Sequence, residues 1–156
     1  MTSKPAVLFV CLGNICRSPL AEAALKAEAA RIGLDVEVDS AGIGSWHAGE
    51  PPDPRARATA KRHGLDISDY RARKITRADF QRFDTIVALD HEVLAALKRM
   101  RPANSTAEVS LLLDHVNGRE GEEVADPYYG DEADFERVWT EVSEGARSLA
   151  KQLTKT

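Results

Sequence analysis

The stretch VLFVCLGNICRSPLAE, residues 7–22, joins an apolar run to a helix-forming run through a short polar loop. Residues 6–10 (AVLFV) are continuously apolar, which is typical of a central parallel strand that is covered on both faces. Ser18 and Pro19 favour the start of a helix, with Ser18 as the N-cap, and Gly33 favours its end. The stretch therefore predicts a strand, a loop and a helix in that order.

The rest of the chain continues this alternation. Strands are predicted at 36–39, 85–89 and 109–113. Helices are predicted from Asp53-Pro54 to Gly64, at 92–100 and at 135–153, the last with Trp139 in its core stripe. Thr76 and Asp79 resemble a capping box that starts a further short helix. Alternating strands and helices favour a parallel sheet with helices on both faces. We therefore expect one α/β domain over residues 1–156, with a four-stranded parallel sheet in the order 2-1-3-4.

Composition limits the classes of function. The 156 residues are 43% hydrophobic and 29% charged, as in an ordinary soluble globular protein. The net charge of −4 disfavours a general nucleic-acid surface. The apolar stretch at 6–12 is too short to span a membrane, and no small-residue cleavage site follows it. We expect a cytoplasmic monomer with neither a nucleic-acid partner nor a membrane partner.

The loops that follow the predicted strands should meet at one edge of the sheet. In such sheets, ligands bind beyond the carboxyl ends of the strands. Residues 11–18 follow the first strand, 40–52 the second, Asp90 the third and 114–130 the fourth. A binding site is therefore expected where these four segments converge.

The first loop has the residues of an anion site. A loop that leads from a strand into a helix N-terminus aims unpaired N–H groups and the positive helix end at one point. Gly13 and Asn14 tolerate positive φ, which lets the loop curl into a concave nest, and Arg17 offers a planar fork for two phosphate oxygens. A helix N-terminus and a nearby arginine favour the thiolate form of a cysteine, so Cys11 is a candidate nucleophile. Without these neighbours, Cys11 would be interpreted as a buried residue at the end of a strand.

Several short motifs match one family in order. They are VLFVCLGNICRSPLAE at 7–22, SAG at 40–42, Trp46, DPRA at 53–56, HG at 63–64 and DPYYG at 126–130. Together they resemble the low-molecular-weight protein tyrosine phosphatases over nearly the whole chain. The resemblance implies a phosphatase that removes phosphate from phosphotyrosine-containing proteins through a phosphocysteine intermediate.

The same resemblance assigns roles within the first loop. It implies that Cys11 attacks phosphorus and that the N–H groups of residues 12–17 and the Arg17 guanidinium hold the phosphate oxygens. Ser18 would bond the sulfur, and Asn14 would bond Ser40 and so hold the shape of the loop. The loop residues Leu12, Gly13, Asn14, Ile15, Cys16 and Ser18 are therefore expected to contact the substrate.

A carboxylic acid is also required by the chemistry. A tyrosyl oxygen is a moderately poor leaving group, so its protonation should accelerate the reaction by about 10²–10⁴-fold. Asp126 lies in the loop after the fourth strand, and Pro127 stiffens its backbone. By resemblance it protonates the phenol and then activates water. The alternative is an ordinary turn residue, since Asp-Pro is a common turn dipeptide.

The walls of the site should select the substrate. By resemblance, Trp46, Tyr128 and Tyr129 surround a deep slot that accepts a phenyl ring; alternatively, Trp46 only covers the edge of the sheet. Relatives that dephosphorylate arginine have Thr at the position of Ile15. Tyrosine-directed members have Ile there, as this chain does. Leu12 also faces the pocket in the family.

Two further residues have two interpretations each. Cys16 is either a small apolar filler or, by resemblance, a redox partner that forms a reversible disulfide with Cys11. His63 either supports the site from behind or caps a helix C-terminus beside its dipole.

No metal or other cofactor is expected, because the four histidines are scattered and no HExxH or CxxC spacing occurs. Three other functions remain as alternatives. They are a thiol-dependent arsenate reductase, which would need cysteines after Cys16, an arginine-phosphate phosphatase, and a domain that binds phosphoproteins without turnover.

Overall fold

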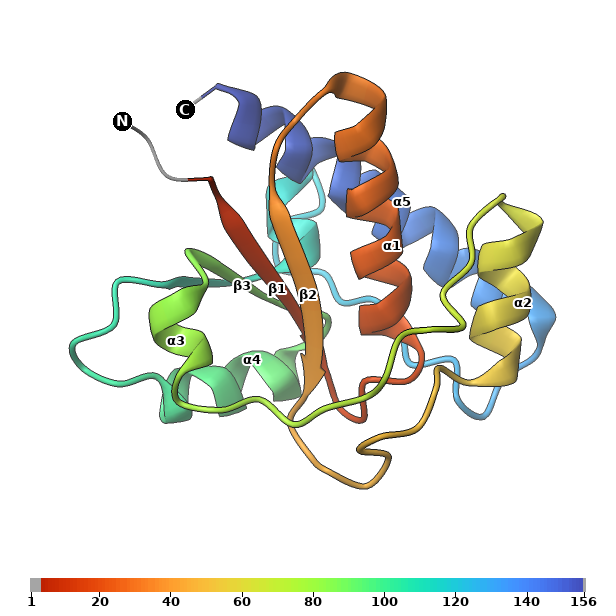
Figure 1. Cartoon of the computed structure of the whole chain (residues 1–156), viewed down its shortest axis with the longest axis horizontal. Helices are drawn as coiled ribbons and strands as arrows, with labels where there is room; N and C mark the ends of the chain where they lie inside the picture. The colour runs from red at the N-terminus through yellow and green to blue at the C-terminus, as the bar shows by residue number, and fades with distance from the viewer. Residues whose placement is uncertain (1–3, 156) are drawn as a thin grey trace.

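A four-stranded parallel sheet forms the centre of the computed structural model, which describes residues 4–155 (Figure 1). Its strands are β1 (Ala6–Cys11), β2 (Glu37–Gly42), β3 (Thr85–Ala88) and β4 (Glu108–Leu111), in the order β2-β1-β3-β4. Every neighbouring pair is parallel. The predicted fold and strand order are confirmed, and β1 is the fully buried strand that its apolar sequence indicated.

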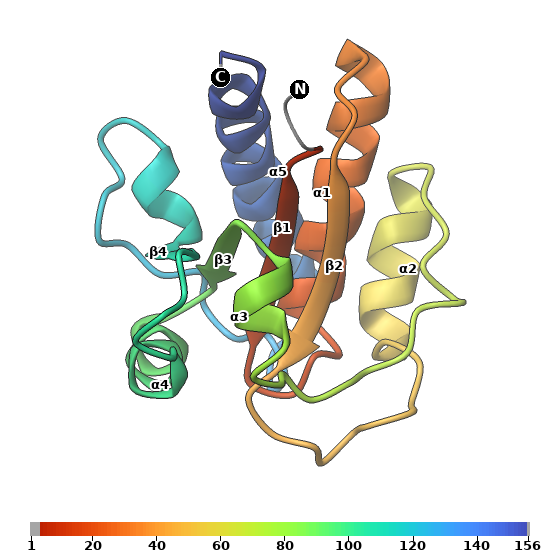
Figure 2. The ribbon, with the colours of Figure 1, turned by 60° about the vertical axis from the view of Figure 1, so that its left-hand side comes forward.

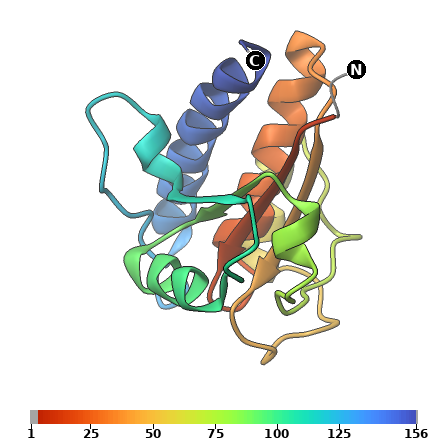
Figure 3. The same cartoon turned by 90° about the vertical axis from the view of Figure 1, so that its left-hand side faces the viewer.

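Helices cover both faces of the sheet (Figure 2). The helices α1 (Arg17–Ile32), α2 (Pro54–Arg62) and α5 (Glu132–Thr154) pack on one face, and α3 (Asp79–Arg82) and α4 (His91–Met100) pack on the other. Alternate residues of β1 divide between the two cores: Val7 and Phe9 join the first, and Leu8 and Val10 the second. Figure 3 shows α1 and α5 side by side on their face.

Several helix ends follow the local signals. Asp53 caps α2 by accepting a hydrogen bond from the Arg55 N–H at 2.8 Å. Gly33 ends α1 in the left-handed region, with φ of 73°. Ser18, in contrast, was wrongly predicted as the N-cap of α1: the helix begins at Arg17, and the N-cap position is Cys16. The Ser18 hydroxyl bonds other side chains of the loop instead of the helix backbone.

Four other expectations need correction. The second strand continues to Gly42 instead of ending at Asp39, because Ser40, Ala41 and Gly42 still pair with β1, so Ser40 lies on the strand and not in the loop after it. The fourth strand ends at Leu111, where the Asp114 carboxylate accepts from the Leu111 N–H and turns residues 112–115 into the 3₁₀ helix η1 (Leu112–His115). The short helix α3 begins at Asp79, whose carboxylate accepts from the Thr76 N–H, so only half of the expected capping box forms. Trp139 is half-buried rather than central, because it stacks on His63 at the edge of the core.

Because every neighbouring pair of strands is parallel, the carboxyl ends of the four strands lie at one edge of the sheet. In Figure 1, β1 and β2 end near the bottom of the view, and the loop after β2 lies there too. The first loop, between β1 and α1, is at the same edge. Within residues 4–155, no helix has the length and the apolar character that crossing a bilayer requires.

Candidate active site

A cavity of about 290 Å³ opens at this edge of the sheet. It is lined by Cys11, Leu12, Gly13, Ile15, Cys16, Arg17, Trp46, His47, Asp126, Tyr128 and Tyr129. Apart from His47, all of these were site residues in the sequence interpretation. Segments from three different loops therefore meet at one place, as the parallel topology requires.

The loop from residue 12 to residue 17 forms the floor of the cavity and carries free donors. Within the described part of the chain, the backbone N–H groups of residues 12–17 donate to no protein acceptor. Cys11, at the end of β1, and Ile15 are both buried beside them. A row of unpaired N–H groups at a helix N-terminus is a site for an anion.

Arg17 supplies a fixed positive charge to this floor. Its side chain is 3% exposed, and Nη1 donates to Asp90 Oδ2 at 2.8 Å and to the Val124 carbonyl at 2.9 Å. Burial opposes the charge, but the Cys11 sulfur and the Asp90 carboxylate raise the pKa of Arg17 above its usual value. Its other terminal nitrogen, Nη2, lies 3.7 Å from Asp126 Oδ2. The guanidinium is thus held from behind and remains a cation.

Asn14 fixes the shape of the loop from the back. It is the non-glycine residue with positive φ, 61°, among the residues described. Its Nδ2 donates to Ser18 Oγ at 2.8 Å and to Ser40 Oγ at 3.0 Å, and its Oδ1 accepts from the Arg73 N–H at 3.0 Å. The expected bond to Ser40 is therefore present. Gly13, which can adopt positive φ at no steric cost, does not do so here.

Ser18 connects this back network to the sulfur. Its Oγ lies 3.0 Å from Cys11 Sγ, a contact that the resemblance implied. The neighbouring strand supports the loop as well: a Cβ on Gly42 would lie 3.0 Å from the backbone of both Leu12 and Gly13. Only a glycine fits there without displacing the loop.

Asp126 stands at the opposite wall of the cavity. Its side chain is 45% exposed, which allows it to meet a substrate. Its Oδ1 accepts from the Tyr128 N–H at 3.1 Å, so it also makes the turn contact of the alternative interpretation. Its other oxygen, Oδ2, faces the Arg17 guanidinium across the cavity.

Aromatic side chains form the rim. Trp46 is 67% exposed and Tyr129 97%, and Tyr129 meets Tyr128 edge-on at 5.0 Å between ring centroids. Arg55 braces this loop, because its guanidinium lies 5.6 Å from the Tyr128 ring and donates to the Gly130 carbonyl. Exposed rings around an apolar cavity suit a flat aromatic group.

Cys16 and His63 differ in their relation to the cavity. Burial, and after it the charge of Asp53, raises the pKa of the Cys16 thiol, so this sulfur is protonated near neutral pH. Both cysteines are free thiols. His63 is the C-cap of α2, bonds Glu136 at 2.8 Å and does not line the cavity. Its position matches the helix-end interpretation.

The contribution of other residues to the site was not identified from the sequence. Asp90 was expected at this edge, but nothing in its neighbourhood indicated a bond to Arg17, 73 residues away. His47 lines the cavity beside Gly13, and its only signal was its place next to Trp46. Glu22 and Arg73 act from behind the loop through Ser40 and Asn14. Among residues 4–155, no group of three or more metal-binding side chains is gathered to hold an ion.

Known proteins resemble the chain over almost its full length. A family described as "Low molecular weight phosphotyrosine protein phosphatase" matches residues 6–156. The Bacillus subtilis low molecular weight protein-tyrosine-phosphatase YfkJ is 40% identical over 152 residues, covering 96% of each chain. A protein tyrosine phosphatase from Entamoeba histolytica, solved with Hepes in the active site, has a TM-score of 0.91 at 35% identity and covers 97% of this chain and 98% of its own. A Drosophila arginine phosphatase has a TM-score of 0.89 at 35% identity, covering 96% and 98%.

Proposed function

Because this chain belongs to the low molecular weight phosphotyrosine protein phosphatase family, we propose that its cavity is the active site, with Cys11 as nucleophile, Arg17 as phosphate ligand and Asp126 as general acid and base. The protein is a protein tyrosine phosphatase that hydrolyses phosphotyrosine through a phosphocysteine. The single observation that carries the residue roles is the meeting of Cys11, the unpaired N–H groups of residues 12–17 and Arg17 at one cavity floor.

The reaction has two displacements at phosphorus. In the first, the Cys11 thiolate forms the S–P bond while the P–O bond to tyrosine breaks, and protonated Asp126 gives its proton to the leaving phenolate oxygen. In the second, the Asp126 carboxylate removes a proton from water, whose oxygen attacks phosphorus as the S–P bond breaks. Phosphate leaves and the thiolate returns. Arg17 and the free N–H groups stabilise the charge on the phosphoryl oxygens in both steps.

The nucleophile is tested by hydrolysis of a phosphotyrosine peptide with EDTA present. Wild-type protein should release phosphate, and Cys11→Ser should lose turnover while it still binds inorganic phosphate. Hydrolysis by Cys11→Ser at a substantial rate would show that the nucleophile lies elsewhere. Failure of the wild type to turn over would favour a phosphoprotein-binding domain.

The acid is tested by the leaving group. Asp126→Asn should slow an ester of a poorly acidic phenol by about 10²–10⁴-fold and an ester of a strongly acidic phenol much less. An equal loss on both substrates would remove Asp126 from the role of acid.

The family likeness includes an arginine phosphatase, so phosphoarginine is the second candidate substrate. The apolar side chain of Ile15 in the buried wall supports phosphotyrosine, because the extra N–H donors of a phosphoarginine would meet no acceptor there. We expect phosphotyrosine peptides to be preferred and Ile15→Thr to move the preference toward phosphoarginine. Comparing kcat/KM for matched peptides tests this. A thiol-dependent arsenate reductase is not supported, because no cysteine follows Cys16.

The pocket-wall roles of Leu12, Gly13, Trp46, Tyr128 and Tyr129 belong to the same proposal, and so does a redox role for Cys16. Cys16 lines the cavity with Cys11, which supports a reversible disulfide. Its raised pKa predicts that the disulfide forms faster at alkaline pH. We also propose that residues 1–156 act as one monomeric, cytoplasmic phosphatase domain on phosphotyrosine-containing proteins, without nucleic-acid or membrane partners.

A further inference from the structure

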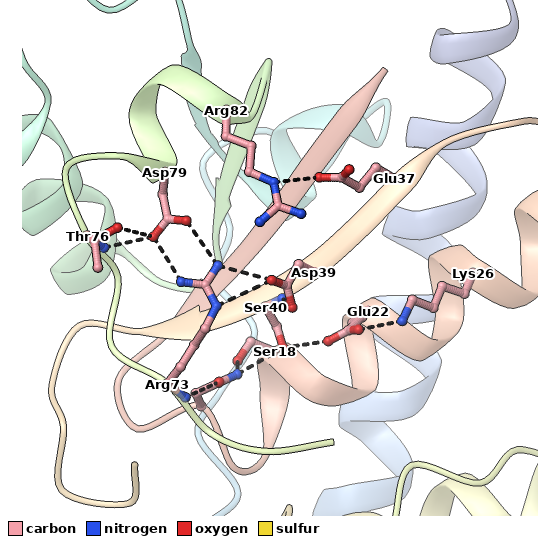
Figure 4. Close-up of polar contacts among 11 residues, drawn as sticks. Ser18, Glu22, Lys26, Glu37, Asp39, Ser40, Arg73, Thr76, Asp79 and Arg82 are labelled. Carbon is pink, nitrogen blue, oxygen red and sulfur yellow. Dashed lines mark hydrogen bonds and ion pairs between the residues drawn. The ribbon is translucent and has the colours of Figure 1, made fainter. Parts of the chain in front are cut away.

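A chain of polar contacts leads from the back of the loop formed by residues 12–17 to a buried carboxylate on α1 (Figure 4). Glu22 is 5% exposed, and its Oε1 accepts from Ser40 Oγ at 2.6 Å. Its other oxygen, Oε2, pairs with Lys26 Nζ at 2.6 Å. Because Ser40 also contacts Asn14, Lys26 is connected to the loop through three side chains.

The hydrogens in this network can be assigned at the end that faces the sulfur. The Arg73 N–H is a donor, so Asn14 presents its carbonyl to Arg73 and its amide hydrogens to the two serines. Since Ser18 accepts one of these hydrogens, its own hydroxyl hydrogen is free for Cys11 Sγ, 3.0 Å away. A hydroxyl that donates to the sulfur favours the thiolate.

The other end of the network depends on the charge of Glu22. An ionised carboxylate only accepts, so Ser40 must donate its hydrogen to Glu22 and offer its lone pair to Asn14. Hydrogen bonds to a charged group are stronger than neutral ones. If Glu22 is protonated, this end loses its charge and holds Asn14 less firmly.

We propose that Lys26 is a positioning residue for the nucleophile, because its ammonium holds the charge on Glu22 and thereby, through Ser40 and Asn14, the donor direction of Ser18. This inference rests on the proposed role of Cys11. Lys26 does not line the cavity and its ion pair is with Glu22, so we expect it to act through the network.

The groups around Glu22 make Lys26 its main support. Burial raises the pKa of Glu22, and Asp39 on β2 adds further negative charge, whereas the hydrogen bonds from Lys26 and Ser40 oppose the rise. From the loop after α2, the Tyr70 ring lies 4.8 Å from Lys26 Nζ and packs against the ammonium. Arg71 Nη1 donates to the backbone carbonyls of Ser68 and Tyr70. Arg73 pairs with Asp39 and Asp79, not with Glu22.

The same helix contains a matched control. Arg31 pairs with Glu28 one turn further along α1, and the Arg31 side chain is 68% exposed. That pair is an ordinary surface pair between neighbouring turns, worth little by itself. Arg31→Met therefore removes a helical ion pair without touching the network.

The test compares the pH profiles of kcat/KM and of Cys11 alkylation by iodoacetamide, with mass spectrometry to identify the alkylated residue. Lys26→Met lets Glu22 take up a proton at higher pH, so the acidic limbs of both profiles should move to higher pH by roughly half a unit. The loss of kcat/KM should be roughly threefold at pH 6 and small at pH 8. Lys26→Arg should restore the wild-type profile, and Arg31→Met should match it.

Glu22→Gln, alone and combined with Lys26→Met, tests whether the effect of Lys26 is merely structural. Glu22→Gln keeps an acceptor for Ser40 but cannot titrate, so Lys26→Met should cause no further shift in that background. Equal thermal unfolding of Lys26→Met and Arg31→Met would separate positioning from stability. An unchanged acidic limb in Lys26→Met, or a full further shift in the Glu22→Gln background, would overturn the inference. Absence of any hydrolysis by the wild type would instead overturn the proposed function.

Discussion

The two sides of the loop formed by residues 12–17 are built in opposite ways. The side that faces the cavity carries unpaired N–H groups and one guanidinium. The side that faces the protein is fully bonded, since all three polar contacts of Asn14 go to Ser18, Ser40 and Arg73. The cavity side provides the chemistry, and the protein side provides the rigidity. A site whose donors are held in place before the substrate arrives has no reorganisation cost at the moment of reaction.

The largest effect is expected on the cavity side, at Arg17. Arg17→Lys keeps a positive charge but removes the planar fork, so kcat/KM for a phosphotyrosine peptide should fall on the order of 10³-fold. Thermal unfolding should change little by comparison. A variant that keeps most of its activity would mean that Arg17 serves only to pair with Asp90.

The next effect tests the protein side, at Asn14. Asn14→Ala removes three hydrogen bonds and forces alanine to adopt φ of 61°, so the free energy of unfolding should fall by about 2–3 kcal/mol. Activity should fall about 10²-fold, because the loop shifts. Asn14→Gly accepts this φ without strain. If the glycine and alanine variants are equally impaired, the hydrogen bonds dominate; full recovery in glycine would show that they contribute little.

A smaller effect should separate stability from activity, at Arg73. Its side chain pairs with Asp39 and Asp79, but its backbone N–H makes the contact with Asn14. Arg73→Met should therefore cost about 1–2 kcal/mol in chemical denaturation and lower kcat only about threefold. This is the reverse of the pattern expected for Arg17→Lys. A severe loss of kcat at unchanged stability would contradict it.

The smallest effect is a pH dependence at Asp79. Burial works against the charge, yet hydrogen bonds from Arg73 and the Thr76 backbone lower the pKa of Asp79 below its usual value. A lowered pKa stabilises the fold above about pH 4 and stops doing so as the pH falls through the folded-state pKa. Wild type should therefore exceed Asp79→Asn by about 1 kcal/mol at pH 7, and the gap should close in acid. A constant gap from pH 7 to pH 3 would refute this assignment.

Local patterns predicted the fold well because the dominant signals are local. The apolar run at 6–10, the Asp53 cap and the Gly33 stop each act within a few residues, and each appears where expected. The failures occur where a distant partner competes. Ser18 looks like an N-cap by itself, but Asn14 and the Cys11 sulfur take its hydroxyl once the loop has folded.

The candidate site divides in the same way. Cys11, Arg17 and Asp126 could be chosen because the topology brings strand ends together and their chemistry is distinctive. Asp90 and Arg73 could not, because their roles depend on contacts that span 73 and 59 residues of sequence. The contact of Arg73 with Asn14 is made by a backbone N–H, which almost every residue type has, so the sequence does not indicate it.

The attachment of the loop to β2 also determines how the enzyme should respond to heat. Ser40 and Gly42, which support the loop from behind, lie on β2, at one end of the β2-β1-β3-β4 order. Among the residues described, the outer edge of β2 bonds to the backbone of another segment only at Gly42, which contacts Arg73 and Ile75. Strands at the margin of a sheet open at lower cost than those at its centre. Warming should therefore loosen this margin, and with it the catalytic geometry, while the helices still give their full circular-dichroism signal. Turnover should accordingly decline at a lower temperature than the one at which the chain unfolds.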